Sequence, residues 1–272
     1  MTATAISPAV IELPRRSTFA WAVADTKTIA WRNLVTLRRL PQLLVFATIQ
    51  PVIFVLMFRY VFGGAIHIRH GSYVNYLMPG VFAQTVAFGA IQTGIGLAED
   101  LHKGLIERFR SLPMARSAVL SGRTLADLTR NVFVMILMIS IGYLVGFRVQ
   151  TGLLGLLAGM AVMLFFGFSL TWIFAIIGLS TTNAESAQAA SFPILAPLVF
   201  ASSAFVVVGT MPGWLQGFAK YQPLSISIDA TRSLMLGGFY SSPGKVLASL
   251  AWSTVIIAVF APLAVRKYRR AA

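Results

Sequence analysis

The chain contains no cysteine among its 272 residues, which excludes disulfide bonds, thiolate metal sites and a cysteine nucleophile. It also lacks the sequence G-x-x-x-x-G-K-[ST], so it has no P-loop with which to bind ATP by itself. Neither an H-E-x-x-H zinc motif nor a nucleophile elbow occurs. The three histidines, His67, His70 and His102, are more typical of solvated loops than of a metal site. We therefore expect no catalytic activity and no metal centre.

Charge is scarce as well, above all negative charge. Eight Asp and Glu stand against 22 Lys and Arg, and charged residues make up only 11% of a chain that is 57% hydrophobic. Soluble domains carry about a quarter charged residues. With a mean hydropathy of +0.78, the composition is that of an integral membrane protein.

Long apolar runs predict an all-α membrane protein with six transmembrane helices, because a spanning helix needs roughly 20 apolar residues. Pro193 and Pro197 interrupt the fifth run. No carboxylate lies in the middle of any run, which disfavours proton or sodium coupling. The predicted spans, within a transmembrane domain of residues 41–272, are 43–62, 73–98, 125–147, 153–180, 187–208 and 246–265.

The basic residues indicate orientation. Sixteen of the 22 Lys and Arg lie in the segments 15–39, 103–130 and 266–270, which an even number of spans would place on one side of the membrane. Since cytoplasmic loops are enriched in Lys and Arg, we expect both termini of this plasma-membrane protein in the cytoplasm. Topology thus accounts for the basic excess, and no nucleic-acid partner is needed.

The segment 17–40 is predicted to be an amphipathic helix lying on the inner membrane surface against lipid, after a disordered stretch over 1–16. Its apolar residues fall on one arc of a helix, with basic residues on the other side. The alternative is a helix packed on a soluble domain, for which the chain offers no candidate. The residues expected at the interface are Trp21, Trp31, Arg32, Arg38 and Arg39.

The segment 209–244 is too polar to span the bilayer and too apolar to lie free in water. Gly and Pro punctuate both of its ends. We expect two short re-entrant helices in the outer leaflet, with Trp214 and Tyr221 at headgroup level. An ordinary extracellular loop is the alternative.

The densest charge in the chain lies between Glu99 and Arg116, where seven of 18 residues are charged. On a helix, Leu101, Leu105, Phe109 and Leu112 form one apolar stripe, opposite a charged face. Pro113 ends the pattern. A cytoplasmic loop that merely obeys the positive-inside rule is the simpler interpretation, but it leaves the three carboxylates unexplained. We therefore predict a partner-docking helix over 99–113.

This segment resembles the cytoplasmic segment of permeases in the type-2 ABC exporter family, with the daunorubicin-resistance permeases as the nearest subgroup. Glu99, Gly104, Glu107, Pro113 and Arg116 correspond to that segment. Leu105 and Phe109 replace a common Thr and Leu. A second likeness is the late stretch from Pro212-Gly213-Trp214-Leu215 to Gln222-Pro223-Leu224-Ser225. The resemblance covers nearly the whole chain.

The resemblance implies a permease that pairs with a second permease, identical or paralogous, and docks two ATP-binding subunits. ATP and Mg would be bound by those subunits, and this chain would bind no cofactor. Segment 99–113 would then be the coupling helix, beside the surface helix 17–40. The expected contacts, led by Glu107 and Arg110, are Glu99, Lys103, Gly104, Glu107, Arg108, Arg110 and Pro113.

In this architecture, spans one, two and five would line a path between the permeases for a hydrophobic or amphiphilic substrate. The polar candidates within them are Gln50, Gln84, Gln92, Ser202 and Ser203. Simple helix–helix hydrogen bonding explains these residues equally well. Two other function classes stay open: an ion-coupled secondary transporter and a membrane scaffold that does not transport.

Overall fold

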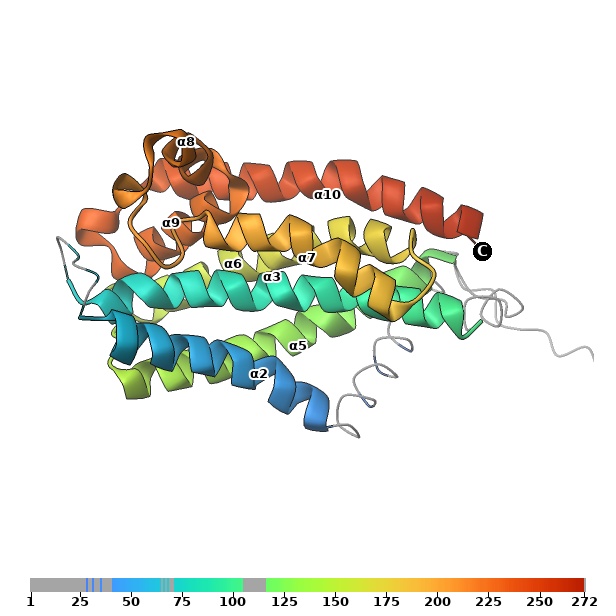
Figure 1. Cartoon of the computed structure of the whole chain (residues 1–272), viewed down its shortest axis with the longest axis horizontal. Helices are drawn as coiled ribbons and strands as arrows, with labels where there is room; N and C mark the ends of the chain where they lie inside the picture. Colours follow the sequence, from blue (N-terminus) through green and yellow to red (C-terminus); the bar gives the residue numbers. More distant parts are fainter. Residues whose placement is uncertain are drawn as a thin grey trace, which may run out of the picture.

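A computed structural model describes residues 28, 31, 35, 41–64, 66, 68, 71–104 and 116–271. Long helices run side by side along the length of the molecule, and two short helices sit at one end, opposite the C-terminus (Figure 1). The helices are α2 (Pro41–Leu56), a π-helical continuation (Met57–Phe62), α3 (Tyr73–His102), α5 (Arg116–Val145), α6 (Gly152–Gly178), α7 (Ala184–Phe200), α8 (Gly213–Tyr221), α9 (Pro223–Leu236) and α10 (Pro243–Ala271), with 3₁₀ turns at Val208–Thr210 and Gly238–Tyr240.

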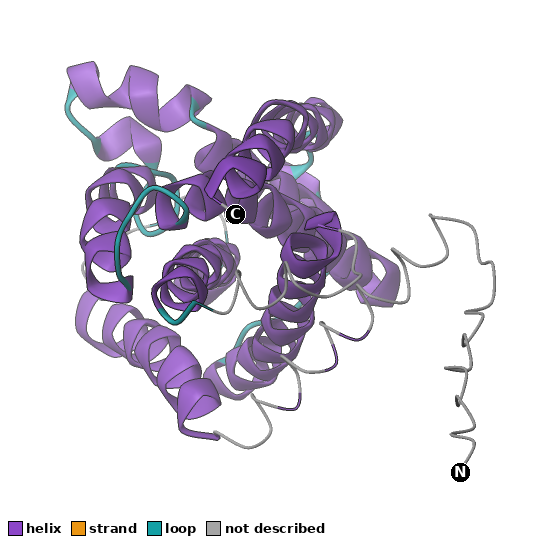
Figure 2. Ribbon diagram, turned by 90° about the vertical axis from the view of Figure 1, so that its right-hand side faces the viewer, coloured by secondary structure: helices purple, strands orange, loops and turns teal. Residues whose placement is uncertain are grey.

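Helix α3 forms the core of the bundle. Viewed along the helices, the other helices are arranged around a central one (Figure 2), and α3 is the spanning segment with the largest buried share. Small residues let its neighbour approach closely: a Cβ at Gly94 would lie 2.4 Å from the carbonyl oxygen of Phe174 in α6. A Cβ at Gly178 would in turn lie 2.1 Å from the carbonyl oxygen of Gly94. Glycine therefore sets the α3–α6 contact, as is common between membrane helices.

Four helical segments are long and apolar enough to cross a membrane: Tyr73–His102, Gly122–Val145, Gly152–Gly178 and Pro243–Tyr268. They overlap the predicted spans 73–98, 125–147, 153–180 and 246–265. The described residues form helices and connecting turns only, which confirms the all-α class for that part of the chain. Thr48–Phe62 is a shorter apolar helix and α7 has 17 residues, so the six-span arrangement stays a prediction.

Two helix ends differ from the sequence-based expectation. Helix α5 begins at Arg116, nine residues before the predicted span, and so includes the charged residues Arg116 and Arg123 ahead of that span. Helix α7 ends at Phe200, although the predicted span ran to 208. The chain leaves the helix after Phe200. Ser202 Oγ donates to the Val199 carbonyl, and the carbonyls of Ser203 and Ala204 accept hydrogen bonds from Arg232 in α9.

The segment 209–244 does contain two short helices, but they differ in burial. Helix α8 is largely exposed, and Trp214 and Tyr221 are among its most exposed side chains. Helix α9 instead packs against α3, α6 and α10. It starts at Pro223, a favoured first helical residue, and ends at Gly237, whose φ of +60° suits glycine. Helix α9 is therefore part of the bundle rather than a surface loop.

Candidate functional site

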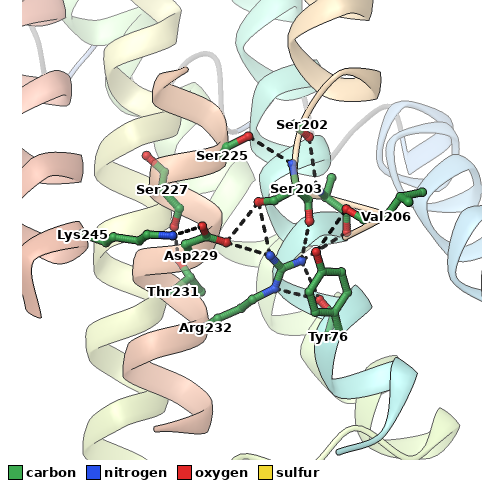
Figure 3. A network of polar contacts seen from close by, with 11 residues as sticks. Tyr76, Ser202, Ser203, Val206, Ser225, Ser227, Asp229, Thr231, Arg232 and Lys245 are labelled. Atoms are coloured by element: carbon green, nitrogen blue, oxygen red, sulfur yellow. Dashed lines mark hydrogen bonds and ion pairs between the residues drawn. The ribbon is translucent and has the colours of Figure 1, made fainter. Parts of the chain in front are cut away.

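A buried arginine organises the end of the bundle where α3 begins (Figure 3). The Arg232 side chain, 2% exposed, projects from α9 and pairs with Asp229 one turn earlier at 2.8 Å. Its Nη2 donates to the carbonyl oxygens of Ser203 at 2.6 Å and Tyr76 at 2.9 Å. Lys245, at the start of α10, also pairs with Asp229. We call Tyr76, Ser203, Asp229, Arg232 and Lys245 the Arg232 network.

The network satisfies a charge that would otherwise be costly to bury. An unpaired ion in a low-dielectric interior costs several kcal/mol, whereas a planar guanidinium with carboxylate and carbonyl acceptors is compensated. The guanidinium carbon also lies 3.6 Å from the centroid of the Tyr76 ring, which adds a cation–π contact. One side chain thereby joins α9 to the first turn of α3 and to the turn after α7.

Further hydrogen bonds fix that turn. The hydroxyls of Tyr73 and Tyr76 donate to the carbonyls of Phe205 and Val206, each at 3.1 Å. The backbone N–H of Ser203 donates to Ser225 Oγ at 3.0 Å. The turn is thus bonded to α3 on one side and to α9 on the other.

A second polar cluster lies at the opposite end, where α3 finishes and α5 starts. Arg123 Nη1 contacts Asp100 Oδ2 at 2.5 Å, and Asp127 Oδ2 accepts from Thr93 Oγ1 at 2.7 Å. Arg130 lies 3.5 Å from Asp127 and donates to the Gly89 carbonyl at 2.8 Å. We call Thr93, Asp100, Arg123, Asp127 and Arg130 the Arg123 network.

The Arg123 network attaches the last turns of α3 to the first turns of α5. Two aspartates and two arginines balance in charge, so the cluster can be part-buried without a net ionic cost. Glycine makes room for it: a Cβ at Gly96 would lie 1.5 Å from Arg123 Nη2. Both helices continue along the chain into the stretch 105–115, which includes the predicted docking residues Glu107 and Arg110.

Some predicted docking residues fall in this region. Lys103 and Glu99 form an exposed ion pair of 2.5 Å. The hydrogen bond to Glu99 raises the pKa of the Lys103 ammonium above its ordinary value. Gly104 follows the end of α3 with a φ of +66°, a conformation that favours glycine.

Other predicted residues lie outside the described part of the chain. Of the expected surface-helix residues, Trp31 is described, helical and exposed. The remainder, on which the structure gives no information, are Glu107, Arg108, Arg110, Pro113, Trp21, Arg32, Arg38 and Arg39.

The five candidate path residues occupy three environments. Gln50 on α2 and Gln92 on α3 are exposed. Gln84 is 1% exposed, and neither its amide oxygen nor its amide nitrogen has a hydrogen-bond partner. Ser202 and Ser203 are buried in the turn after α7, where Ser203 belongs to the Arg232 network. These contacts do not join the five residues into one path.

The three-residue spacing of Asp127 and Arg130 predicts their ion pair, which the structure contains at 3.5 Å. Sequence reasoning missed the roles of Asp229 and Arg232 at one end of the bundle and of Asp100 at the other. Asp229 and Arg232 were treated as parts of an outer segment, and Asp100 only as one charge on the docking helix. A signal was present: an acidic and a basic residue three apart in an otherwise apolar helix can pair on one face. The hydrogen bond from Arg232 to Tyr76, 156 residues away along the chain, cannot be recognised from any local sequence pattern.

Comparison with known proteins decides the family. The sequence model for the ABC-2 type transporter matches residues 24–236. The chain belongs to the ABC-2 type transporter family. A daunorubicin resistance ABC transporter permease of Streptomyces coeruleorubidus, DrrB1, is 40% identical over 260 residues, which cover 95% of this chain and 89% of that relative. The Mycobacterium tuberculosis protein named "Probable doxorubicin resistance ABC transporter permease protein DrrC" is 29% identical over 227 residues, 83% and 81% of the two chains.

The resemblance inferred from the sequence is therefore confirmed, and this ABC-2 chain is a multi-pass membrane permease. The residues matched to the ABC-2 family include the whole Arg123 network and all of the Arg232 network except Lys245. Both networks thus belong to the ABC-2 membrane unit itself, not to an appended segment.

Proposed function

We propose that this ABC-2 chain is the membrane subunit of an ATP-driven exporter that moves a hydrophobic or amphiphilic molecule out of the cytoplasm. The observation that carries the proposal is the 40% identity, over 95% of the chain, to a permease named for daunorubicin resistance. A strongly apolar bundle suits such a molecule, because the path would need no ring of charge to hold an ion.

The energy would come from separate ATP-binding subunits, since the chain has no P-loop. Two such subunits would bind ATP and Mg and dock on the coupling helix 99–113 and the surface helix 17–40. A second permease, identical or paralogous, would complete the path. In this arrangement α2 with its π-helical continuation is the first of six spans, α7 is the fifth, and both termini are cytoplasmic.

The Arg123 network supports a mechanical role for this end of the molecule. A push on the stretch 105–115 would reach α3 through Gly104 and α5 through Arg116, and the Asp100–Arg123 contact would make the two helices move together. Ion coupling is disfavoured because Asp127, the carboxylate in the Gly122–Val145 span, is already paired with arginine.

Reconstitution tests the proposal. The chain is co-expressed with an ABC ATP-binding subunit, and daunorubicin uptake into inside-out vesicles is followed by fluorescence. We expect uptake only with ATP and both subunits. Uptake that follows a proton gradient without ATP would establish secondary transport instead. Stable partner binding without any uptake of daunorubicin or other amphiphiles would establish a scaffold.

The coupling contact is tested separately by Glu107→Lys. We expect daunorubicin export to fall about 5- to 150-fold while purified yield and melting temperature stay unchanged, because reversing a charge at a docking contact costs about 1–3 kcal/mol of coupling. Lys220→Glu on α8, a charge reversal at the other end of the bundle, is the matched control. Export that survives Glu107→Lys would remove Glu107 from the docking contact.

A further inference from the structure

An apolar groove runs between α5 and α6 on the flank of the bundle. It has a volume of about 570 Å³, within the range of about 300–1,000 Å³ typical of small-molecule sites. It opens laterally, and almost all of its lining is hydrocarbon. The lining residues are Thr124, Leu125, Leu128 and Val132 on α5 and Ala161, Leu164, Phe165, Phe168 and Trp172 on α6.

The groove has about the length of one leaflet. Its α6 wall extends from Ala161 to Trp172, eleven residues or about 16 Å of helix. Half of a hydrocarbon core of about 30 Å is roughly 15 Å. Ala161 lies nine residues after the start of α6 and Trp172 six residues before its end, so the groove crosses the middle of the helix and lies slightly nearer the end beside the last turns of α3.

The groove also contains one polar atom that lacks a partner. Trp172 is 8% exposed and packs its ring edge-on against Phe168, and its indole Nε1 has no hydrogen-bond acceptor in the protein. A buried indole N–H usually finds an acceptor. Trp172 marks the end of the groove that lies nearer the end of α6.

Positive charge lies just beyond that end. Trp172 packs in one cluster with Ala264 of α10, and one turn later Lys267 hydrogen-bonds to Ser180, just past α6. Arg266 and Arg270 flank Lys267 on the same helix, and α10 carries no carboxylate. The Arg123 network balances its own charges, so the end of α10 presents excess positive charge at headgroup depth.

We propose that the α5–α6 groove binds an anionic phospholipid from the adjacent leaflet, with one acyl chain between the two helices and its phosphate beside Lys267. The fit rests on three features: an apolar trough about one leaflet long, lateral access from the bilayer and an excess of positive charge just beyond one end of the trough. None of the groove's lining residues belongs to the Arg232 network or to segment 99–113, so the lipid proposal does not rest on the proposed export function.

Tryptophan quenching by brominated lipid tests the site. A single-tryptophan variant keeps Trp172 and replaces Trp21, Trp31, Trp214 and Trp252 with Phe. It is reconstituted in phosphatidylcholine vesicles that contain an equal small fraction of brominated phosphatidylglycerol or brominated phosphatidylcholine. We expect phosphatidylglycerol to quench Trp172 at least about twofold more strongly, since a nearby Lys or Arg favours an anionic headgroup.

Two variants in this background locate the lipid. Ala161→Phe fills the groove and should remove most of the quenching, whereas Ala258→Phe, at an exposed alanine of α10, should leave it unchanged. Lys267→Gln should make the two lipids quench equally. A second background that keeps only the exposed Trp252 should show no effect of Ala161→Phe.

Four results would overturn the proposal. Quenching that Ala161→Phe leaves intact would place the lipid elsewhere, and equal quenching by both lipids in the parent would remove the anionic headgroup. The absence of quenching would mean that protein covers the groove. Relief of quenching by added daunorubicin, at concentrations that leave Trp252 unaffected, would make a drug the occupant.

Discussion

At the scale of single residues, Arg232 shows how a charged side chain can stabilise an apolar bundle. Its planar guanidinium reaches a carboxylate, several carbonyl oxygens and an aromatic face at once. A lysine at this position has three donors on one atom and could not reproduce that fork. The stabilisation depends on shape as much as on charge.

Replacement of this residue should therefore be severe. In Arg232→Met, Asp229 loses a partner and the carbonyls of Tyr76 and Ser203 lose their donor, so we expect a loss of about 3–5 kcal/mol in unfolding free energy. Thermal unfolding in detergent micelles, followed by tryptophan fluorescence, measures the change. Lys220→Met on the exposed α8 is the control and should unfold like the parent. Equal melting of both variants would show that the network contributes no stability.

Single glycines also contribute to stability where the backbones of two elements are in close contact. A Cβ in Gly80→Ala would lie 2.1 Å from the Ala204 carbonyl oxygen, so α3 and the turn after α7 would have to separate. We expect a loss of about 1–3 kcal/mol. Gly217→Ala in α8 meets nothing within 4 Å and should instead gain about 0.5–1 kcal/mol from helix propensity. The melting temperatures of the two variants should thus shift in opposite directions.

At the scale of elements, the junction of α3 with α5 depends on ion pairs rather than on apolar packing alone. Asp100 and Arg123 are both mostly buried and in direct contact. By contrast, Glu99 and Lys103 form their pair in solvent, where screening leaves little net effect. The two ion pairs use consecutive acidic residues, Glu99 and Asp100, but should contribute differently to the free energy of unfolding.

A double-mutant cycle measures this difference. For Asp100→Asn with Arg123→Gln, we expect a coupling energy of about 1–3 kcal/mol, because residues in contact within one network do not behave additively. The matching cycle on Glu99 and Lys103 should show a coupling indistinguishable from zero. Denaturant unfolding in mixed micelles gives both values. Coupling of equal size in both cycles would contradict the assignment of the junction to the buried pair.

Long elements could be predicted from the sequence, and their ends and partners could not. Hydrophobic length alone located α3, α6 and α10, since roughly 20 apolar residues in a row have few other uses. The end of α7 at Phe200 could not be predicted, because it depends on the carbonyls of Ser203 and Ala204 accepting hydrogen bonds from the distant Arg232. The burial of α9 was missed for the same reason: its polar residues bond to distant segments instead of water.

The candidate site could also be predicted only in part from the sequence. Charge density at 99–116 drew attention to the end of the bundle where the Arg123 network lies, although the network itself uses Thr93 and Arg130 outside that stretch. Gln50, Gln84 and Gln92 are predicted to line the substrate path only because they are polar residues in apolar helices. Polarity alone does not show which way a side chain faces on a helix. Gln84 is buried, whereas Gln50 and Gln92 are exposed.

At the scale of the whole molecule, the proposed topology places the Arg123 network and the C-terminus in the cytoplasm and α8 outside. The absence of native cysteine makes this directly testable, because each introduced thiol is the only one in the chain. In intact cells, Lys220→Cys should react with a membrane-impermeant maleimide. Glu185→Cys and Arg270→Cys should react only after the membrane is opened.

Each of the three positions is a charged side chain outside the four apolar spans, so the substitutions should leave folding intact, which is checked by yield. Labelling of Arg270→Cys from outside would invert the orientation. Labelling of Lys220→Cys and Glu185→Cys from the same side would mean that α7 does not cross the membrane, and the six-span arrangement would fail.

The central position of α3 has a mechanical consequence. Tyr76 and Asp100, its contacts with the two polar networks, are 24 residues apart, or about 36 Å along one continuous helix. A tilt of 1° about either end displaces the other by roughly 0.6 Å over that length. Hydrogen bonds weaken over displacements of that size. The helix is therefore a lever: a tilt of a few degrees about the Asp100 end is enough to break the bonds to Arg232 at the far end.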